Sequence, residues 1–433
     1  MNLKEILKAM KKEGADQAEV SCLRSSFRTV TFENNLLKSL HSTTETTWRL
    51  RAVVENRLGS FSTNRPEQLL SAARQVVAMA RASLPDPYAV LPCPQPVQPV
   101  PGLFHKQEVD LKEVLQAGCQ LVETFRKYDR RVSVDSASVE VTSSEVAIVS
   151  TRGVKAEERR SCTQYFLMGL AAEGTTVSSF DYRFNAGVSW KETVAKIQED
   201  AIQLASELTR SLGARTAPVF TGDVLLSPET VADFISALDF LINARNVQER
   251  RSRFAGKINQ PVASSCLTIV DKPLQPGLPW STSFDSEGVA TRTLTVVEKG
   301  VLRAYLYDTY AAVREQRSST GHADGQMHQP TLEATASLKE MQSAVRRGVL
   351  VRRFSGNISP INGVVSGLVK GGWYIENGQL LYPITDTMLS GDFFQMLKKV
   401  VAISRETEPT PCGYLPYMLV EGVTILGDED KGT

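Results

Sequence analysis

Histidine, the side chain most often used for acid–base chemistry or zinc binding near neutral pH, is scarce in this chain of 433 residues. Two of its four histidines, His322 and His328, lie in one polar segment with Asp324 between them. Two imidazoles and a carboxylate could ligate a metal ion. A flexible polar loop that carries its histidines incidentally explains the same composition, and we favour the loop.

Two carboxylates, Asp285 and Glu287, stand two positions apart and could act as a general acid and a general base. They directly precede Gly288, so a tight turn with that glycine at positive φ accounts for them more simply, and we favour the turn. Two clusters of basic residues could meet an acidic partner or nucleic acid, but they have no interleaved aromatic residues and the total charge is near zero, so we interpret them as solvated faces. The clusters are Arg245, Arg250, Arg251, Arg253 and Lys257, and then Arg346, Arg347, Arg352 and Arg353.

Motifs of the common catalytic classes are missing from the sequence. There is no GxxxxGKS/T phosphate loop, no GxGxxG after a strand, no GxSxG nucleophile elbow and no HExxH zinc helix. The 49 Lys and Arg residues balance 48 Asp and Glu residues, which argues against a protein that binds nucleic acid by neutralising phosphates. Residue types and spacing alone therefore show no catalytic constellation.

In the first half of the chain, the sequence predicts a helix–strands–helix unit that occurs twice. We interpret it as an internal duplication over residues 1–84 and 109–212. The proline-rich linker at 85–102 separates the two copies, and we expect it to be extended and stiff rather than packed. Apolar spacing predicts helices at 2–13, from Pro66 onward, at 110–128 and at 190–212.

The second half is mostly strand. A helix at 228–243 comes first, capped by Ser227, and a further helix is predicted at 391–404. Hairpin turns are predicted at Lys299-Gly300 and at Asn377-Gly378. Strands that cluster apart from helices indicate an α+β class, with an N-terminal domain over 1–215 and a β-rich C-terminal domain over 216–433.

Composition indicates a globular protein, because 42% of the residues are hydrophobic and 22% are charged. No apolar run approaches the roughly 18–20 residues of a membrane-spanning helix, and the N-terminus lacks an apolar core of signal-peptide length. The six cysteines are scattered without a CxxC pair, which is typical of reduced thiols. We therefore expect a cytoplasmic protein without membrane contact.

Several long segments of the second half, in order, resemble the TldD/PmbA family, whose members are described as modulators of DNA gyrase and as metallopeptidases. They are STSFDSEGVATRTLTVVEKGVLRAYLYDTYAA (281–312), SSTGHA (318–323), GVLVRRFSG (348–356), VSGLVKGGWYIENGQLLYPITD (365–386) and CGYLPYMLVEGVTILG (412–427). The repeated first half and the VLLSPETVADF segment look similar as well. The resemblance implies an α+β N-terminal domain on a β-rich C-terminal domain, assembled into dimers around an internal cavity.

The same resemblance singles out the helix after the VLLSPE segment. In the catalytic, TldD-like branch this helix carries HExxxH, whose histidines bind zinc with a downstream cysteine while the glutamate acts as general base. Here Ser236 and Leu241 stand at the ligand positions and Ala237 at the base position. Leucine and alanine offer no donor, and a serine hydroxyl is a poor zinc ligand. Cys412 matches the downstream cysteine, but one thiolate cannot hold zinc by itself.

The chain thus resembles the PmbA (TldE) branch, which lacks the metal site. This implies a non-catalytic subunit of a zinc metallopeptidase complex that acts in proteolysis or maturation of unfolded peptides, with zinc only in a TldD-like partner and no cofactor in this chain. Strand-rich walls would hold an extended peptide as an added strand. The alternative is a homodimer that acts as a peptidase-like or peptide-binding protein without such a partner, using residues such as His322, Asp285 and Glu287. We expect no direct binding of nucleic acid.

Two segments of the resemblance supply candidates for a peptide groove, the Ser-Thr-Gly-His loop and the Gly-Gly-Trp strand start. Paired glycines would let a peptide backbone approach closely, although a bulge at the start of a strand explains them equally well. The groove candidates are Asp285, Glu287, Ser319, Thr320, Gly321, His322, Gly371, Gly372 and Trp373.

Overall fold

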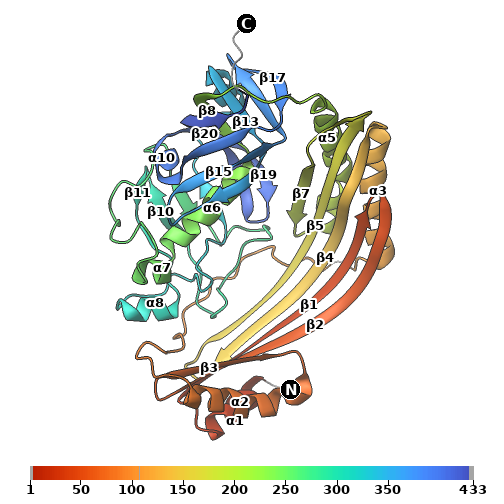
Figure 1. Cartoon of the computed structure of the whole chain (residues 1–433). Coiled ribbons are helices and arrows are strands. Elements are labelled where there is room, and N and C mark those ends of the chain that lie inside the picture. The colour runs from red at the N-terminus through yellow and green to blue at the C-terminus, as the bar shows by residue number, and fades with distance from the viewer. Residues whose placement is uncertain (1–2, 107, 429–433) are drawn as a thin grey trace.

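The structure is a computed structural model that describes residues 3–106 and 108–428, so Asn2 of the predicted first helix lies outside the described residues. It has a mixed α+β fold, in which a long curved sheet stands beside a β-rich domain (Figure 1). The predicted α+β class is therefore confirmed. No helix in the described part of the chain is long and apolar enough to cross a lipid bilayer.

The first half of the chain forms one antiparallel sheet with helices on it. Its described strands lie in the order β3-β2-β1-β4-β5-β6, and β7 pairs with β5. Helix, strands and helix occur twice, and the two sets meet where β1 pairs with β4, but a duplication as their origin stays a prediction. The elements are α1 (Leu3–Lys12), β1 (Gln17–Glu33), β2 (Leu36–Val54), β3 (Arg57–Thr63), η1 (Pro66–Gln68), α2 (Leu69–Ala82), α3 (Leu111–Tyr128), β4 (Val132–Ser150), β5 (Lys155–Glu173), β6 (Thr176–Val177), β7 (Asp181–Gly187), α4 (Trp190–Val194) and α5 (Ile197–Arg210).

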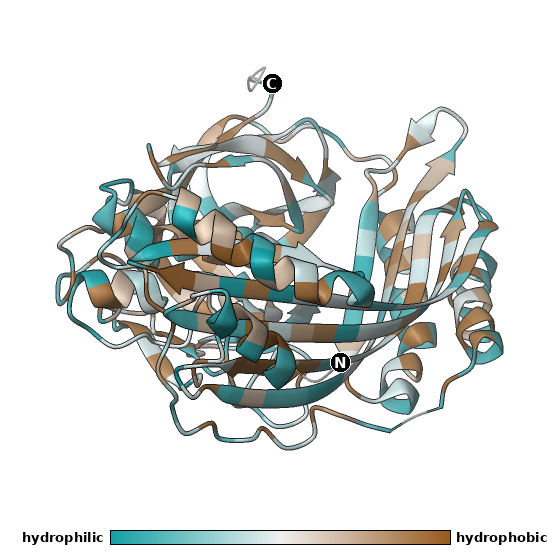
Figure 2. Ribbon diagram, turned by 90° about the horizontal axis from the view of Figure 1, so that it is seen from below, coloured by the Kyte–Doolittle hydropathy of each residue, from teal (hydrophilic) through white to brown (hydrophobic). Residues whose placement is uncertain are grey.

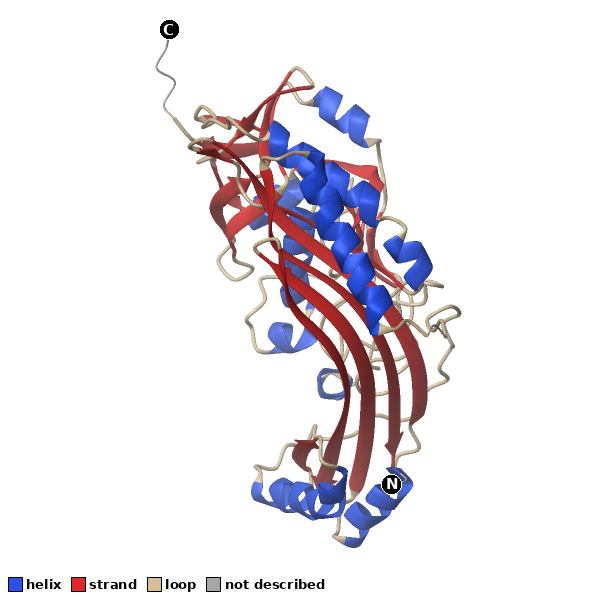
Figure 3. Cartoon of the chain, turned by 90° about the vertical axis from the view of Figure 1, so that its right-hand side faces the viewer, coloured by secondary structure: helices blue, strands red, loops and turns tan. Residues whose placement is uncertain are grey.

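Four strands of this sheet, β1, β2, β4 and β5, are 17 to 19 residues long and bend together as one curved ribbon (Figure 3). Strands in globular proteins are usually about 5–6 residues long. Through most of β5 buried and half-buried residues alternate, and Figure 2 shows alternating bands of hydropathy along the ribbon. A period of two is what a strand produces when one of its faces meets a core.

Helices cover the two ends of one face of this ribbon and leave its middle bare (Figure 3). At one end, α1 and α2 pack on Val20 and Leu50. At the other end, α3 and α5 pack on Val30 and Tyr165. The β-rich domain meets the opposite face, where Phe284 packs among residues of β4 and β5. Each helix pair therefore buries an apolar patch of its own.

The second half builds a larger core around a second sheet. Its described strands lie in the order β14-β15-β18-β20-β8-β13-β16-β17, with β19 on β20, and α6 packs against this sheet. A smaller sheet has the order β11-β10-β9-β12. The elements are β8 (Phe220–Leu226), α6 (Pro228–Ile242), α7 (Ala244–Gln248), β9 (Ile269–Asp271), β10 (Leu294–Glu298), β11 (Val301–Leu302), α8 (Thr309–Arg314), β12 (Pro330–Leu332), α9 (Leu338–Ala344), β13 (Arg347–Val351), β14 (Arg353–Ile358), β15 (Val364–Lys370), β16 (Gly372–Glu376), β17 (Gln379–Ile384), β18 (Met388–Asp392), α10 (Phe393–Lys398), β19 (Val400–Thr410) and β20 (Gly413–Leu426).

Two predicted helices differ from the structure. The helix predicted at 190–212 is interrupted between α4 and α5. The helix predicted at 391–404 is wrong beyond Lys398, because β19 begins at Val400 and pairs with β20. A short apolar run rich in β-branched residues suits a buried strand as well as a helix, so periodicity cannot decide between them.

The proline-rich linker at 85–102 has no helix or strand, as an extended segment should, but the expectation that it does not pack is wrong. Leu91 and Val100 are buried. The Val100 N–H donates to the Ser283 hydroxyl of the β-rich domain, at 3.3 Å. The linker therefore runs along the seam between the domains and contributes to it.

A buried ion triad joins the ribbon to the β-rich domain. The Arg51 guanidinium of β2 donates two hydrogen bonds of 2.8 Å to Glu19 on β1 and one of 2.8 Å to Glu287. All three side chains are at most 10% exposed. Burial raises the pKa of Glu19 above its ordinary value, whereas the Arg51 charge and its hydrogen bonds lower it. Arg51 therefore stabilises the ionised carboxylate inside the protein.

Replacing Arg51 by Met should destabilise the folded chain by about 3–5 kcal/mol, because Glu19 and Glu287 would stay buried without their cation. Urea unfolding followed by tryptophan fluorescence measures the loss. The matched control is Arg49→Met, on the same strand and the same face but exposed; it should cost less than about 0.5 kcal/mol. Equal losses in the two variants would contradict the triad as a structural link.

Candidate functional site

Helix α6 carries the positions at which the catalytic branch has its zinc motif. Ser227 caps the helix, and Pro228 occupies its first position. Ser236 is exposed, and its hydroxyl donates to the Ala232 carbonyl at 3.0 Å. Ala237 is 5% exposed, and Leu241 is fully buried in the core of the β-rich domain. Position 241 thus serves packing.

Cys412 lies close enough to α6 to respond to its charges. Burial raises the pKa of its thiol, a contact with Thr410 lowers it, and the carboxyls of Asp239 and Asp233 raise it further. The Cys412 sulfur is 3.4 Å from the Thr410 hydroxyl. Zinc binds the thiolate, and this environment favours the protonated thiol.

These groups do not fit a zinc ion. Asp239 offers a carboxyl group on α6 between positions 237 and 241. This carboxyl accepts a hydrogen bond from the Met327 N–H at 3.1 Å, and burial raises its pKa well above the ordinary value. Among residues 3–106 and 108–428, no group of three or more His, Cys, Asp or Glu residues is placed to hold a metal ion. Tetrahedral protein sites need three or four donors.

A shallow groove runs beside these positions, between α6 and the outer strand β14. Its volume is about 490 Å³. β14 pairs with β15 on one edge, and no described strand covers its other edge. Such an edge can accept an extended chain through main-chain hydrogen bonds. The groove residues are Asp233, Ser236, Ala237, Phe240, Phe354, Gly356, Asn357, Ile358 and Pro360.

The Ser-Thr-Gly-His segment is buried, so the preferred interpretation of His322 and His328 as part of a flexible polar loop is wrong. The His322 side chain is 0% exposed, with Nε2 2.9 Å from Asp271 Oδ2 and Nδ1 3.0 Å from Thr320 Oγ1. Its ring stacks on His328 with centroids 5.0 Å apart. Asp324, the proposed third ligand, instead accepts a hydrogen bond from Ser286.

Ser319 and Thr320, which precede His322, are fixed by hydrogen bonds to the backbone of Tyr307. The Ser319 hydroxyl donates to the Tyr307 carbonyl at 2.9 Å, and the Thr320 hydroxyl accepts from the Tyr307 N–H at 2.8 Å. Gly321 has φ +78°, and a Cβ there would lie 2.5 Å from the Ala290 carbonyl oxygen. Only glycine fits this position. Contact of Ser319, Thr320, Gly321 or His322 with a peptide stays a prediction.

Asp285 and Glu287 form the predicted turn, with Gly288 at φ +75°. Burial raises the pKa of Asp285 to about 7, and the Glu287 charge adds to the rise. Asp285 accepts a hydrogen bond from the Ala323 N–H at 3.0 Å, so the turn also fixes the histidine segment. Burial alone would raise the pKa of Glu287, but Arg51 and the Thr309 N–H hold it below its ordinary value.

The Gly-Gly-Trp candidates lie where β15 ends and β16 begins. Gly371 has φ +62°. A Cβ on Gly372 would lie 2.4 Å from a methyl carbon of Val369. Trp373 pairs with Leu350 of β13 and Pro383 of β17 inside the sheet. The chain runs on from β15 into β16 without reversing, opposite the junction of β13 and β14, so the glycines mark a kink at the start of a strand. Contact of Gly371, Gly372 and Trp373 with a peptide stays a prediction.

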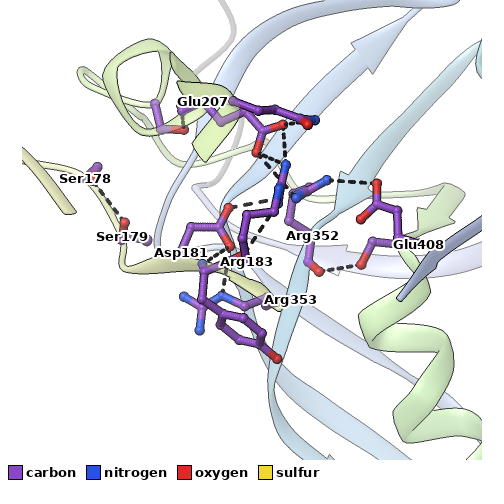
Figure 4. Close-up of polar contacts among 12 residues, drawn as sticks. Ser178, Ser179, Asp181, Arg183, Glu207, Arg352, Arg353 and Glu408 are labelled. Carbon is purple, nitrogen blue, oxygen red and sulfur yellow. Dashed lines mark hydrogen bonds and ion pairs between the residues drawn. The ribbon is translucent and has the colours of Figure 1, made fainter. Parts of the chain in front are cut away.

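The second basic cluster is only partly a solvated face. Arg346 is exposed, but Arg352 and Arg353 close the seam between the two sheets (Figure 4). Arg352 is 12% exposed, and its nitrogens lie 3.4 Å from Glu207, 3.9 Å from Asp181 and 3.8 Å from Glu408. Arg353 lies 3.4 Å from Asp181. Asp181 and Glu207 belong to the ribbon half, so these ion pairs bind it to the β-rich domain.

Arg183 of β7 completes this network. Its guanidinium donates to both oxygens of Glu207, at 2.7 and 2.6 Å. Sequence reasoning missed the whole network. The one available signal was the adjacent pair Arg352-Arg353 directly after a buried strand, and nothing in the sequence links it to acids more than a hundred residues away.

A small polar cleft of about 120 Å³ lies within the seam, between β7, the end of β19 and the start of α6. Glu229, in the first turn of α6, lines it. One oxygen of Glu229, Oε1, is buried and has no hydrogen-bond partner among the described residues. Burial, reinforced by the Asp181 charge, raises the pKa of Glu229 to about 9, so this carboxyl is neutral at pH 7.

Models of three successive domains of one family match the chain. Residues 18–80 match "PmbA/TldA metallopeptidase domain 1", residues 105–209 match the "central domain" and residues 221–427 match the "C-terminal domain". The chain belongs to the PmbA/TldD metallopeptidase family. The resemblance seen in the sequence is thereby confirmed.

Relatives of this family match the chain over nearly its whole length. An uncharacterised protein of Methanocaldococcus jannaschii is 26% identical over 93% of this chain and 95% of its own length. The metalloprotease PmbA of Escherichia coli is 23% identical over 94% of this chain and 93% of its own length.

Two solved structures share the fold. The crystal structure of TldE from Thermococcus kodakarensis has a TM-score of 0.90, at 20% identity, and covers 98% of this chain and 99% of that chain. A Thermotoga maritima protein described as a proposed modulator of a DNA gyrase has a TM-score of 0.88, at 22% identity, with coverages of 98% and 99%. At these identities the likeness establishes the architecture of the PmbA/TldD family.

Glu229→Gln should make the protein more stable at pH 8, with a gain that shrinks toward pH 5. The folded chain keeps Glu229 protonated up to a pKa of about 9, whereas the unfolded chain ionises it above 4.5. Folding therefore binds a proton between these values, and wild-type stability falls as pH rises, by up to about 1.4 kcal/mol per pH unit. Urea midpoints at pH 5, 6.5 and 8 measure the difference.

Glu67→Gln is the control for this prediction, because Glu67 is an exposed residue in the first turn of another helix. Its stability should follow that of the wild type at every pH. A gain for Glu229→Gln that does not vary with pH would show that the carboxyl is not neutral in the folded chain.

Proposed function

We propose that this chain is a non-catalytic, PmbA/TldE-like subunit that pairs with a TldD-like, zinc-bearing subunit of a metallopeptidase and helps to hold its unfolded peptide substrate. The observation that carries the proposal is the side-chain chemistry of α6. The motif positions hold a methyl group at Ala237 and an isobutyl group at Leu241, which is fully buried. Neither can bind zinc or move a proton.

The groove between α6 and β14 supports the peptide-holding part of the proposal. The outer edge of β14 can hydrogen-bond an extended chain whatever its sequence, as an enzyme of unfolded peptides requires. Phe240 and Phe354 line this groove with apolar surface, and Ser236 lines it with a hydroxyl group. In this proposal the chain would hold the peptide there, and the zinc-bearing partner subunit would supply the hydrolytic chemistry.

The alternative, a homodimer that acts on peptides with His322, Asp285 and Glu287, finds less support. Those side chains are 0%, 3% and 8% exposed, respectively. Glu287 is committed to Arg51, and His322 to Asp271. Reaching a substrate would require breaking contacts that hold the domains together, so we favour the subunit role.

Purified from cells grown with zinc, the chain should contain far less than one zinc ion per molecule, as measured by inductively coupled plasma mass spectrometry. The reason is the missing donor set at positions 236, 237 and 241. Cys412→Ser should leave the metal content unchanged. One zinc per chain that disappears in Cys412→Ser would contradict the proposal.

Co-purification tests the partner. An affinity-tagged chain should retain a family member that carries HExxxH from the same cell, and the pair should cleave an unfolded, fluorescein-labelled casein. Ser236→Arg, which fills the groove, should raise the KM of the pair for casein, whereas Gln198→Arg, exposed on α5, should not. Casein cleavage by the chain alone after exhaustive chelation would overturn the subunit role.

A further inference from the structure

The groove between α6 and β14 has two chemically different ends. The starts of α6 and β14 lie together, because the Ser227 hydroxyl donates a hydrogen bond to the Arg352 carbonyl. Toward this end, the exposed side chain of Asp233 lines the groove with a carboxyl group. Phe240, in the last turn of α6, and Pro360, just beyond β14, line the other end. The groove therefore runs from an acidic end to an apolar end.

The spacing of the two ends suits a short extended peptide. Asp233 and Phe240 are seven positions apart on α6, which is about 10 Å at roughly 1.5 Å per residue. An extended peptide covers that distance with about three residues, at roughly 3.3 Å each. Two side chains of one short segment can therefore contact both ends of the groove.

A basic segment begins where α6 ends and α7 follows it (Figure 1). From Arg245 to Lys257 the chain has five basic residues and one acidic residue, in a protein whose formal net charge is +1. Arg245 is paired with Asp308. The other basic side chains of this segment are exposed, as the sequence predicts; they are Arg250, Arg251, Arg253 and Lys257.

Arg251 is fixed beside Phe240. Its guanidinium lies 5.6 Å from the centroid of the Phe240 ring and donates a hydrogen bond to the Asn246 side chain. Arg251 also forms an ion pair of 3.4 Å with Glu249, and the side chains of this pair are 55% and 50% exposed. An ion pair that faces water to this extent is weak, so Arg251 can exchange Glu249 for another carboxylate.

Arg253 is fixed on the turn that follows β14. It donates a hydrogen bond of 3.5 Å to the Asn362 carbonyl, two positions after the groove residue Pro360, and its guanidinium lies 4.1 Å from the centroid of the Phe394 ring. No carboxyl group of the described residues forms an ion pair with Arg253. A guanidinium has five N–H donors, so most of them remain available here.

We propose that Arg251 and Arg253 select peptides with acidic side chains, which they bind where the groove ends at Phe240. The proposal rests on the proposed function, because it concerns the peptide that this chain holds. Main-chain pairing with β14 accepts any sequence, and the two arginines add a preference for charge. The planar guanidinium suits this role, because it binds a carboxylate through two parallel hydrogen bonds.

The test is the binding of dye-labelled, unfolded decapeptides to the purified full-length chain, followed by fluorescence anisotropy. Three peptides share one sequence and differ only at two adjacent central positions, which are Glu-Glu, Gln-Gln or Lys-Lys. In about 0.05 M salt, the Glu-Glu peptide should bind about fivefold more tightly than the Gln-Gln peptide, and the Lys-Lys peptide should bind most weakly. In about 0.5 M salt the differences should shrink, because salt screens exposed charges.

Charge reversal distinguishes this preference from a loss of structure. The double variant Arg251→Glu, Arg253→Glu should bind the Lys-Lys peptide most tightly, and a chain that has lost its fold cannot invert the order. The matched control is Lys339→Glu, Arg346→Glu, which reverses two exposed charges on and just after α9. Because α9 packs on the opposite face of the sheet from α6, this control should keep the wild-type order.

Equal affinities of the wild-type chain for the three peptides would overturn this proposal alone, as would an unchanged order in Arg251→Glu, Arg253→Glu. Tighter binding of a dye-labelled, ten-nucleotide DNA strand than of any peptide would assign the basic segment to nucleic acid and overturn it as well. If none of the peptides binds, the peptide-holding part of the proposed function fails together with this proposal. The different outcomes therefore separate the two failures.

Discussion

A buried arginine between two glutamates is the contact on which the arrangement of this molecule depends. Arg51 belongs to the curved sheet, and Glu287 to a turn of the β-rich domain between β9 and β10. Glu287 also accepts a hydrogen bond from the Thr309 N–H at the start of α8, and its neighbour Asp285 accepts one from Ala323. A single cation thus fixes a turn, a helix start and the buried histidine segment. Ion pairs removed from water have this effect only when every partner is satisfied.

The second seam, around Arg352, explains why α6 keeps its place without metal ligands. The backbone carbonyl of Arg352 accepts a hydrogen bond from Ser227, the residue that caps α6. Below the cap, Phe234 and Leu238 bury the inner face of the helix. Helix position and helix chemistry are therefore separable. Packing and capping hold α6 in place without any metal ligand.

Sequence reasoning recovered the features that local chemistry determines. The Ser227-Pro228 start of α6 and the Asn377-Gly378 hairpin, with φ of 49° and 76°, are set by neighbouring residues. The end of α10 was missed because valines there suit either a helix or a strand. The ion networks could not be found, because Arg51 and Glu287 lie 236 positions apart in the chain. From the sequence alone, charged residues that form buried ion pairs with distant partners cannot be told apart from exposed charged residues.

The site was recovered in the same uneven way. The resemblance placed Ser236, Ala237 and Leu241 on one helix, and the structure shows that helix intact. Burial of His322 could not be foreseen, since a short Ser-Thr-Gly-His run is polar in composition. Its partner Asp271 belongs to β9, a strand of three residues that is too short for a sequence pattern to predict. The positive φ of Gly288 was predicted correctly, because this glycine follows Asp285 and Glu287 in a stretch that favours a turn.

The pairing of β1 with β4 in the long curved sheet also constrains how the chain folds. Glu19 of β1 lies opposite Ser150 of β4, so the central ladder of the ribbon joins segments far apart in sequence. Such long-range pairing carries a large loop-closure entropy and slows folding. During synthesis the first hairpin leaves the ribosome well before β4, with one margin of β1 unsatisfied. Chaperone binding to nascent chains should therefore concentrate on that hairpin until the second unit has been translated.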